Sequence, residues 1–291
     1  MKEDKVSSTA LTVLQGILYR ANKKETSHLV SDEMSEACRK ILNSTKEGQK
    51  RLNQLDSKLF NFSVPIVENL MMPGITLHYV MRKKYIEEYS REAIERGFTQ
   101  VINLGAGFDT LAYRLSKEFS DISFIEIDHP ATQVHKQEAL QDANRDNLHL
   151  LCVDFSKQNL KDELKNFDGF DPNKNTLFIC EGVLMYLDED SVKELFASLK
   201  ELTNADMEFI FTFIEPMKEN LNSYGLLLKL YLKIKKEDLN WSIKRDRVKE
   251  FLESIGYIQK ELLEIDYFRK NYLKGLANIR LHESEFIAVA K

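Results

Sequence analysis

Residues 100–128 read QVINLGAGFDTLAYRLSKEFSDISFIEID, and this stretch decides the fold class. It holds a short apolar run, a turn with two glycines, a segment of helical spacing and a second apolar run. That order is typical of a βαβ unit in a parallel sheet. The turn follows the first strand at its carboxyl end, where doubly wound sheets bind cofactors. We therefore expect Gly105, Ala106 and Gly107 to approach a cofactor closely, because glycine lets the backbone turn sharply.

The same alternation continues along the chain and sets the expected architecture. Further strands are expected at residues 122–127, 148–153, 176–180, 208–213 and 286–290. Helices are expected at residues 77–96, 109–118, 131–143, 191–202 and 248–255, and Asp109 is well placed to cap the second of these. Strands that alternate with helices predict an α/β, Rossmann-like fold with a doubly wound, mostly parallel sheet.

The flanking segments fit a single domain with additions to this core. Residues 1–75 show helical spacing and end at a Met-Pro-Gly turn, which predicts a helical N-terminal cap. Residues 76–214 form the expected cofactor-binding core, and 248–291 the C-terminal helix and strands. Residues 215–247 are expected to form a lid insertion.

The stretch 225–249 is rich in Leu and Lys. It allows either a basic patch for an anionic partner or an amphipathic helix with a solvated face, and the helix is the favoured interpretation.

Composition excludes several classes of protein. The 291 residues are 43% apolar and 30% charged, as is usual for a soluble globular protein, and the net charge is −5. The acidic balance disfavours nucleic acid and anionic membranes as partners. The three cysteines form no CxxC pair, so a disulfide framework and a Cys-ligated zinc site are not expected, and a reducing cytoplasm fits best. The six histidines show no metal-ligand spacing, so we expect no metal site.

Acidic residues follow the next three expected strands. Glu126 and Asp128 end the second strand, Asp154 follows the third and Glu181 the fourth. An acid after the second strand is the usual acceptor for ribose hydroxyls and fits either NAD or S-adenosylmethionine. Several carboxylates would repel a pyrophosphate, whereas they suit the sulfonium and ammonium of S-adenosylmethionine. Each acid alone could instead be a solvated carboxylate at a loop edge. Asp128 lies at the strand tip and is the better ribose acceptor, while we expect Glu126 to be a supporting residue.

Four stretches resemble a known family. They are MRKKYIEE (81–88), INLGAGFDTLAYRL (102–115), FIEIDHPATQVHKQ (124–137) and CEGVLMYLDEDSV (180–192). They are similar to the leucine carboxyl methyltransferase family, and more closely to its bacterial branch of S-adenosylmethionine-dependent O-methyltransferases. The resemblance implies a class I methyltransferase fold with an antiparallel C-terminal strand, and S-adenosyl-L-methionine as the cofactor.

The resemblance also implies roles for individual residues. Arg82 matches an arginine that lies beside a carboxylate of the cofactor or the substrate, and Gly105 matches a glycine of the cofactor loop. Asp128 matches the acid that binds the ribose, and Asp154 matches the acid at the adenine, next to the backbone N–H of Phe155. Glu181 matches an acid near the methionine end of the cofactor. Tyr186 matches a tyrosine that faces the transferred methyl group in some members. The family often has leucine where Phe155 stands, a change that a backbone contact tolerates. No N-terminal lysine of the eukaryotic protein-modifying members can be placed here, so the expected acceptor is a small molecule.

The acceptor class decides whether a base is needed. A carboxylate is ionised at neutral pH and needs none, whereas a hydroxyl needs a general base within hydrogen-bond reach. His78, near Arg82, is a candidate base, while His129 before Pro130 fits a turn better. Tyr186 could orient the acceptor or simply be a packed aromatic.

Two other functions remain open. An NAD(P)-dependent oxidoreductase could use the same architecture, but the dinucleotide motif GxGxxG wants glycine or alanine where Thr110 stands. A non-catalytic S-adenosylmethionine-binding module would show the same cofactor residues.

Overall fold

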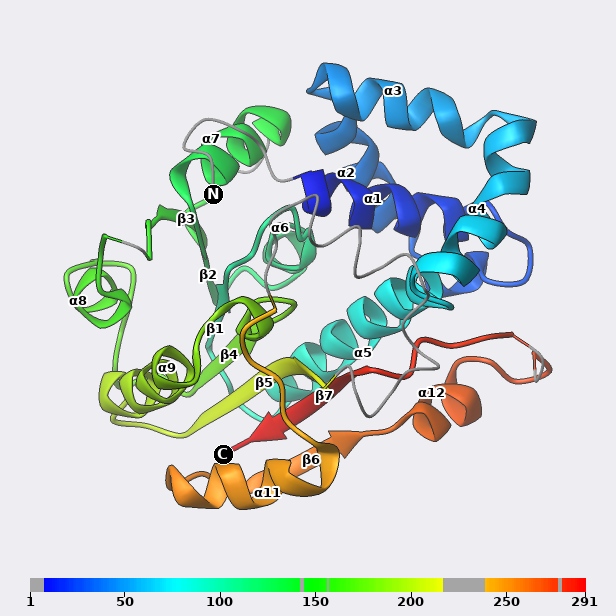
Figure 1. The fold of residues 1–291 in the computed structure, drawn as a ribbon. Coiled ribbons are helices and arrows are strands. Elements are labelled where there is room, and N and C mark those ends of the chain that lie inside the picture. The colour runs from blue at the N-terminus through cyan, green and yellow to red at the C-terminus, as the bar shows by residue number, and fades with distance from the viewer. Residues whose placement is uncertain (1–7, 142–143, 156, 217–238, 277–278) are drawn as a thin grey trace.

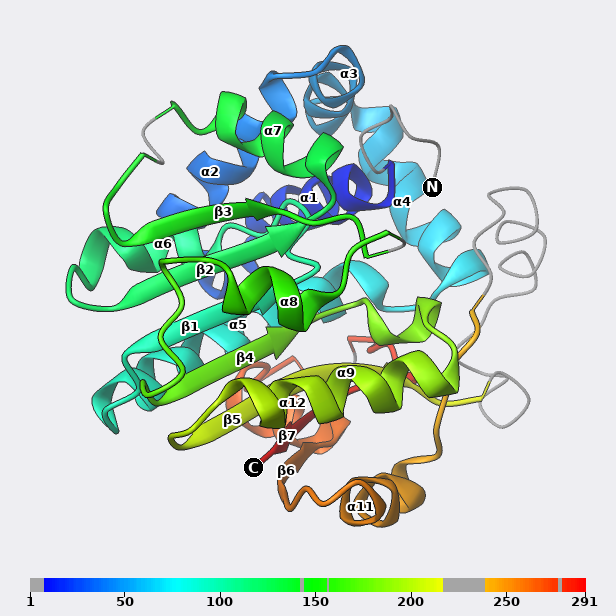
Figure 2. The same cartoon turned by 90° about the vertical axis from the view of Figure 1, so that its left-hand side faces the viewer.

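A seven-stranded sheet forms the centre of the molecule in this computed structural model (Figures 1 and 2). The structure describes residues 8–141, 144–155, 157–216, 239–276 and 279–291. The strand order is β3-β2-β1-β4-β5-β7-β6. The strands are β1 (Gln100–Leu104), β2 (Ser123–Asp128), β3 (Leu148–Cys152), β4 (Thr176–Cys180), β5 (Met207–Ile214), β6 (Gln259–Leu263) and β7 (Glu285–Ala290).

Strand direction confirms the predicted fold class. Strands β1 to β5 are parallel to one another, and β7 is antiparallel to both β5 and β6. This is the doubly wound, mostly parallel sheet with an antiparallel C-terminal strand. The antiparallel direction of β7 has one consequence for the site. Its first residue, Glu285, lies opposite Ile214, the last residue of β5, and so at the edge where the parallel strands end.

Helices cover both faces of the sheet (Figure 2). One face carries α8 (Leu160–Lys165), α9 (Glu189–Leu202) and α11 (Arg245–Ser254), and the other carries the remaining helices. Those are α1 (Ser8–Ala21), α2 (Asp32–Asn43), α3 (Lys46–Leu55), α4 (Lys58–Met71), α5 (Ile75–Glu95), α6 (Leu111–Glu118), α7 (Pro130–Ala139) and α12 (Ile265–Asn271), with the short 3-10 helix η1 (Ser27–Leu29). A second 3-10 helix, η3 (Leu184–Tyr186), follows β4, and its Leu184 joins the core on the face of α9.

Two apolar cores result from this layering, because successive side chains of a strand point to opposite faces. In β1, Val101 joins the core under α5, whereas Ile102 and Leu104 join the core under α9. Every residue of β1, β4, β5 and β7 is buried, as is usual for strands covered on both faces.

Helix α5 connects the N-terminal helices to the sheet. It begins after Gly74, whose φ of 79° places the predicted Met-Pro-Gly turn in the left-handed region. A Cβ at Gly74 would lie 2.4 Å from the backbone carbon of Leu281, so only glycine fits this turn. The helix has 21 residues and therefore spans about 31 Å. Its N-terminal half bonds Glu181 and Glu285 where the parallel strands end, and Arg96 at its C-cap bonds Glu208 near the start of β5.

Some predictions for the C-terminal third lie outside the described residues. Most of the expected lid insertion falls on residues 217–238, for which no structure is described. Strand β6 was not predicted. Within the described ranges, no helix combines the length and apolar character that crossing a membrane requires.

Candidate functional site

The glycine turn after β1 lies where the sequence places it. Gly105 and Gly107 have φ values of 64° and 51°, in the left-handed region. A Cβ at Gly105 would lie 2.5 Å from Cγ2 of Val183, so this glycine also allows a close approach to the segment after β4. The backbone N–H of Ala106 donates to the Ile127 carbonyl at 3.1 Å. The turn at the end of β1 thus packs against the end of β2 and the segment after β4, and we call residues 105–107 the glycine cradle.

Asp128 at the end of β2 is tied to this cradle. Its Oδ2 accepts the backbone N–H of Gly107 at 2.7 Å, and its Oδ1 accepts that of His129 at 2.7 Å. A carboxylate has about four lone-pair sites, so both oxygens retain capacity for hydroxyl donors. His129 caps α7, since its Nδ1 accepts the N–H of Ala131 at 3.3 Å. The expected turn role of His129 fits this geometry.

Glu126, two residues earlier on the same strand, has a different environment. Its side chain is fully buried and forms an ion pair with Lys136 of α7, which is fully buried as well. Burial raises the pKa of Glu126, and Lys136 opposes that shift. The pair joins α7 to β2 beneath Asp128, which agrees with a supporting role.

Asp154 and Phe155 follow β3 on the other side of Asp128. Oδ2 of Asp154 lies 3.2 Å from Nζ of Lys157 and 3.8 Å from Nε2 of His129. The Phe155 side chain is 44% exposed. Both residues therefore lie at the surface of the sheet edge, one strand beyond Asp128.

Arg82 and Lys83 of α5 meet three carboxylates on the opposite side of the cradle. Nε of Arg82 donates to Oε1 of Glu181 at 2.6 Å, and the same guanidinium bonds Glu285 of β7. Nζ of Lys83 lies 2.9 Å from both Oε2 of Glu181 and Oδ2 of Asp109. These five buried side chains join α5, the glycine turn, β4 and β7 into one ionic cluster.

Four members of the cluster have shifted pKa values that favour their charged forms despite burial. Burial alone would lower the pKa of Arg82 and Lys83, but the surrounding carboxylates outweigh it and raise both pKa values. Burial alone would raise the pKa of Asp109 and Glu285, yet Lys83 and Arg82 respectively hold each pKa well below its usual range. The opposite charges in contact therefore favour the charged forms of Arg82, Lys83, Asp109 and Glu285 in a largely buried position.

Asp109 lies beside the start of α6, but it is not the N-cap residue that the sequence predicts. Its Oδ1 accepts the N–H of Leu111 at 2.9 Å, which supports the first turn of α6. However, α6 begins at Leu111 with Thr110 at the N-cap position, two residues later than expected. The other oxygen of Asp109 is the partner of Lys83.

His78, the candidate base, is held inside the protein. It is 1% exposed, and its Nε2 lies 3.0 Å from Oε2 of Glu285. Its ring also contacts that of His282 edge to face, with centroids 5.5 Å apart. A base must reach the proton that it removes, so this geometry argues against a direct catalytic role for His78.

Tyr186 lies in η3 after β4 and is 38% exposed. Its backbone carbonyl accepts a hydrogen bond from the Asn240 side chain at 2.9 Å, which joins this loop to the segment before α11. The exposure favours a tyrosine that faces the outside of the loop over a fully packed aromatic.

Sequence reasoning missed two members of the cluster. Lys83 follows Arg82 directly within the stretch MRKKYIEE, so its position could have identified it as a candidate site residue. Glu285 precedes the last apolar run, but only the antiparallel direction of β7 brings it to the site edge.

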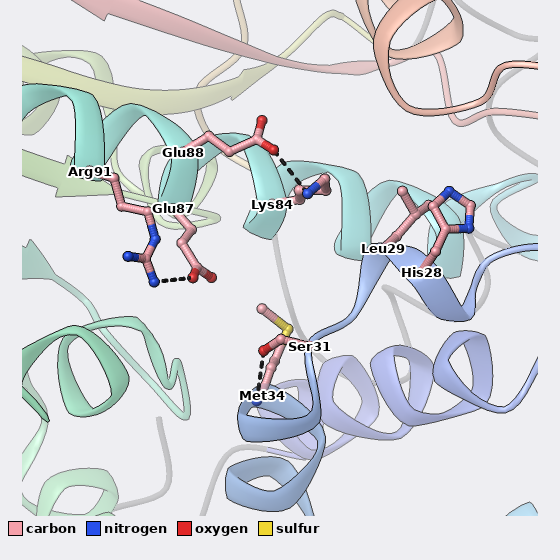
Figure 3. A pocket seen from close by; sticks show the side chains of 8 residues that line it. All are labelled: His28, Leu29, Ser31, Met34, Lys84, Glu87, Glu88 and Arg91. Atoms are coloured by element: carbon pink, nitrogen blue, oxygen red, sulfur yellow. Dashed lines mark hydrogen bonds and ion pairs between the residues drawn. The ribbon is translucent and has the colours of Figure 1, made fainter. Parts of the chain in front are cut away.

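A cavity of about 190 Å³ lies elsewhere, between η1 and α5 (Figure 3). Its α5 residues, Lys84, Glu87, Glu88 and Arg91, share one helix face, and Arg82 lies on the opposite face. They neutralise one another, since Lys84 bonds Glu88 and Arg91 bonds Glu87. We therefore place the functional site at the sheet edge and not in this cavity.

The side chains at the sheet edge fit S-adenosylmethionine better than a dinucleotide. The carboxylate of Asp128 beside the glycine cradle suits the hydroxyl groups of a ribose. The ionic cluster offers both signs of charge to an amino-acid group. Across the residues that the structure describes, His, Cys, Asp and Glu side chains form no group able to hold a metal ion. The three cysteines are free.

Comparison with known sequences agrees with the motifs. The profile of the family described as leucine carboxyl methyltransferase matches residues 14–200. Leucine carboxyl methyltransferase 1 of Caenorhabditis elegans is 23% identical over 265 residues, which cover 79% of this chain and 77% of that protein. A Bacillus subtilis protein named "Putative S-adenosyl-L-methionine-dependent methyltransferase" is 31% identical over 137 residues, or 46% of this chain and 44% of that protein. The match therefore spans less than half of this bacterial relative.

Solved structures share the fold. A protein from Streptomyces avermitilis described as a duf574 family protein superposes with a TM-score of 0.60 at 10% identity, and 96% of each chain is covered. A structure titled as a putative methyltransferase from Thermobifida fusca has a TM-score of 0.58 at 15% identity, with 87% of this chain and 93% of that chain covered. At such identities the likeness shows the fold alone, which is that of class I methyltransferases.

The sequence profile covers well over half of the chain and includes the glycine turn, the strand-end acids and the arginine of α5. The resemblance predicted from the four motifs is thereby confirmed. The chain belongs to the leucine carboxyl methyltransferase family, a family of S-adenosylmethionine-dependent methyltransferases.

Proposed function

We propose that the protein is an S-adenosylmethionine-dependent O-methyltransferase that acts on a carboxyl or hydroxyl group of a small molecule, with a carboxylate favoured. The observation that carries this proposal is the division of the sheet edge into two parts. A glycine cradle with Asp128 and Asp154 lies on one side, and a cluster of paired charges around Arg82 lies on the other.

The cradle is the proposed site of the adenosine. Asp128 would accept the ribose hydroxyls, and Asp154 with the backbone N–H of Phe155 would hold adenine. Gly105 and Gly107, both in the left-handed region, and Ala106 between them would let the backbone approach the ligand.

The ionic cluster is the proposed site of the amino-acid end. The carboxylate of that group needs a cation such as Arg82, and its ammonium needs an anion such as Glu181. Counting the five paired side chains, three carboxylates against two cations leave one excess negative charge, which suits a cationic sulfonium. S-adenosylmethionine, when bound, supplies an electrophilic methyl group on an excellent leaving group.

The chain's own task is then mainly to position the reactants. Well-oriented reacting pairs gain about 7–11 kcal/mol from alignment and avoided solvent reorganisation. The engagement of His78 with Glu285 supports a carboxylate acceptor, because that group is ionised at neutral pH and needs no base. Tyr186, partly exposed after β4, is proposed to orient the acceptor.

We also propose that the whole chain is one methyltransferase domain whose helical cap, residues 1–75, contributes to the acceptor side. Packing of α1 against α5, the helix that bears Arg82, supports this arrangement.

The proposal is tested by mass spectrometry of the purified protein and of its reaction mixtures. Native spectra identify any small molecule that is retained. Mixtures with S-adenosylmethionine and a panel of small carboxylic acids and alcohols should yield S-adenosylhomocysteine and a methyl ester. The Asp128→Ala variant should lose this product, whereas Asp121→Ala, at the opposite end of β2 and exposed, should keep it. Turnover of a nicotinamide cofactor instead would indicate an oxidoreductase, and tight cofactor binding with no methylated product would indicate a binding module.

A further inference from the structure

Arg82 is held by carboxylates from two different strands. Glu181 after β4 takes its Nε at 2.6 Å, and Glu285 at the start of β7 bonds Nη1. The third guanidinium nitrogen, Nη2, faces the turn after β4, where a Cβ at Gly182 would lie 3.8 Å away. Two anchors thus fix the plane of the guanidinium and direct its remaining edge toward the turn.

Glu285 is in turn fixed by His78. Its Oε2 accepts from Nε2 of His78 at 3.0 Å, while Oε1 bonds Arg82. His78 and Arg82 are four residues apart on α5, so they lie on the same helix face and one carboxylate bridges them. All three side chains are at most 7% exposed. The bridge therefore has little freedom to reorient.

The buried ion pair between Arg82 and Glu285 costs desolvation free energy, and a side chain that only stabilised the fold would not require that cost. A buried ion pair pays a large desolvation penalty and seldom stabilises a fold more than apolar packing would. Here the buried carboxylate lies behind the arginine that the family motif places at the cofactor or the substrate. Nothing in the family motif includes Glu285, which lies beyond the matched residues 14–200.

We propose that Glu285, itself fixed by His78, is a positioning residue that holds Arg82 in the orientation needed to bind the carboxylate at the amino-acid end of S-adenosylmethionine. This inference rests on the proposed function. It assigns the buried histidine a supporting role in place of base catalysis. It also makes the last strand of the chain a determinant of cofactor affinity.

The test compares two probes that differ at the amino-acid end. S-adenosylhomocysteine carries the carboxylate and the ammonium, whereas 5′-methylthioadenosine lacks both and keeps the adenosine. Calorimetry should show that Glu285→Gln weakens S-adenosylhomocysteine about tenfold, the effect of losing one hydrogen bond to a charged group. Binding of 5′-methylthioadenosine should change less than about twofold. This probe lacks the amino-acid group, and the substitution at Glu285 leaves the proposed adenosine site unchanged.

The chain offers a matched control for general destabilisation. Glu208 is a similarly buried carboxylate with two cationic partners, Arg96 and Lys260, at the opposite end of the same β5–β7 strand pair. Glu208→Gln should therefore leave the affinities for both probes unchanged. Glu285→Asp keeps the charge but shortens its reach, and it should show the same selective loss if Glu285→Gln does not fold.

A double-mutant cycle asks whether Glu285 acts through Arg82. Once Arg82→Met has removed the guanidinium, adding Glu285→Gln should weaken S-adenosylhomocysteine no further. Additive losses, equal weakening of both probes, or no weakening of either by folded Glu285 variants would overturn the inference. If the unaltered protein binds neither probe, the proposed function itself fails and the inference falls with it.

Discussion

Two acids of one strand, Glu126 and Asp128, have different environments, and we propose that the first supports the fold and the second binds the ligand. Glu126 is buried against Lys136, whereas Asp128 faces the glycine turn and retains acceptor capacity. The position of Asp128 at the strand tip predicts this difference from the sequence, although the two acids share a strand face. The buried partner of Glu126 on α7 supports its proposed role as a supporting residue.

Exchanging each acid for alanine should therefore affect different properties: mainly stability for Glu126 and mainly cofactor affinity for Asp128. Glu126→Ala leaves the Lys136 charge buried without its partner, and we expect a loss of about 3–5 kcal/mol in the free energy of unfolding. Asp128→Ala should cost less stability but weaken S-adenosylmethionine about tenfold or more, since hydrogen bonds to a charged group contribute about 1.5–3 kcal/mol each. Urea unfolding and calorimetry on both variants measure the two effects. Equal binding by folded Asp128→Ala would contradict the ribose assignment.

Because the pKa values of Glu285 and Asp109 are lowered in the folded protein, the free energy of unfolding should vary with pH in the acidic range. A carboxyl whose pKa is lower in the folded state stabilises the fold at pH above its unfolded pKa, about 4, and this contribution is lost as the pH falls below that value. Unfolding free energy should therefore be steady from pH 7 to 5 as far as these groups are concerned, and then decline. In Glu285→Gln the decline should be shallower. An unchanged slope in that variant would show that the ion pair does not form in solution.

The pH dependence of methyl transfer addresses the acceptor. With a carboxylate acceptor and no base, the rate should be nearly flat from about pH 6 to 8, because the acceptor is already ionised. Initial rates of S-adenosylhomocysteine formation measure this once an acceptor is known. A rate that rises through the window and is abolished by His78→Ala would instead indicate base-assisted methylation of a hydroxyl.

At the scale of elements, the glycine turn gives a prediction with an internal control. Gly105→Ala and Gly107→Ala both place alanine in the left-handed region, at a cost of about 1–2 kcal/mol each. Only Gly105→Ala adds a clash, since its Cβ would lie 2.5 Å from Val183 whereas nothing lies within 4 Å at Gly107. Thermal unfolding should therefore show the larger loss for Gly105→Ala. Val183→Ala should recover part of that loss, and absence of any recovery would contradict the described contact.

The elements differ in how well the sequence predicts them, for physical reasons. Strand β4, TLFIC, is a mostly apolar run bounded by turns, and its observed limits match the expected residues 176–180. Strand β1, QVINL, is the first apolar run of the quoted stretch 100–128, although Gln100 and Asn103 interrupt it. Strand β6, QKELL, has little apolar character and lies at the sheet edge, so it carries no comparable signal. Helix α6 starts two residues later than expected, and the Asp109 side chain, expected to cap it, instead accepts the N–H of Leu111 and pairs with Lys83.

For the whole molecule, the candidate site is assembled from segments far apart in the chain. Local patterns indicate the glycine turn and the acids after β2, β3 and β4, because carboxyl ends of parallel strands share one edge. The contribution of β7 depends on its antiparallel pairing with β5, a long-range contact that no local pattern encodes. The apolar core on one face of the sheet then fixes α5, which brings Arg82 and Lys83 to the same edge.

The central claim concerns the cofactor, and binding measured by calorimetry tests it most directly. The protein should bind S-adenosylmethionine and S-adenosylhomocysteine, should not bind NAD or NADP, and should lose at least tenfold in affinity in Asp128→Ala but not in Asp121→Ala. Binding of a nicotinamide dinucleotide without binding of S-adenosylmethionine would contradict the account.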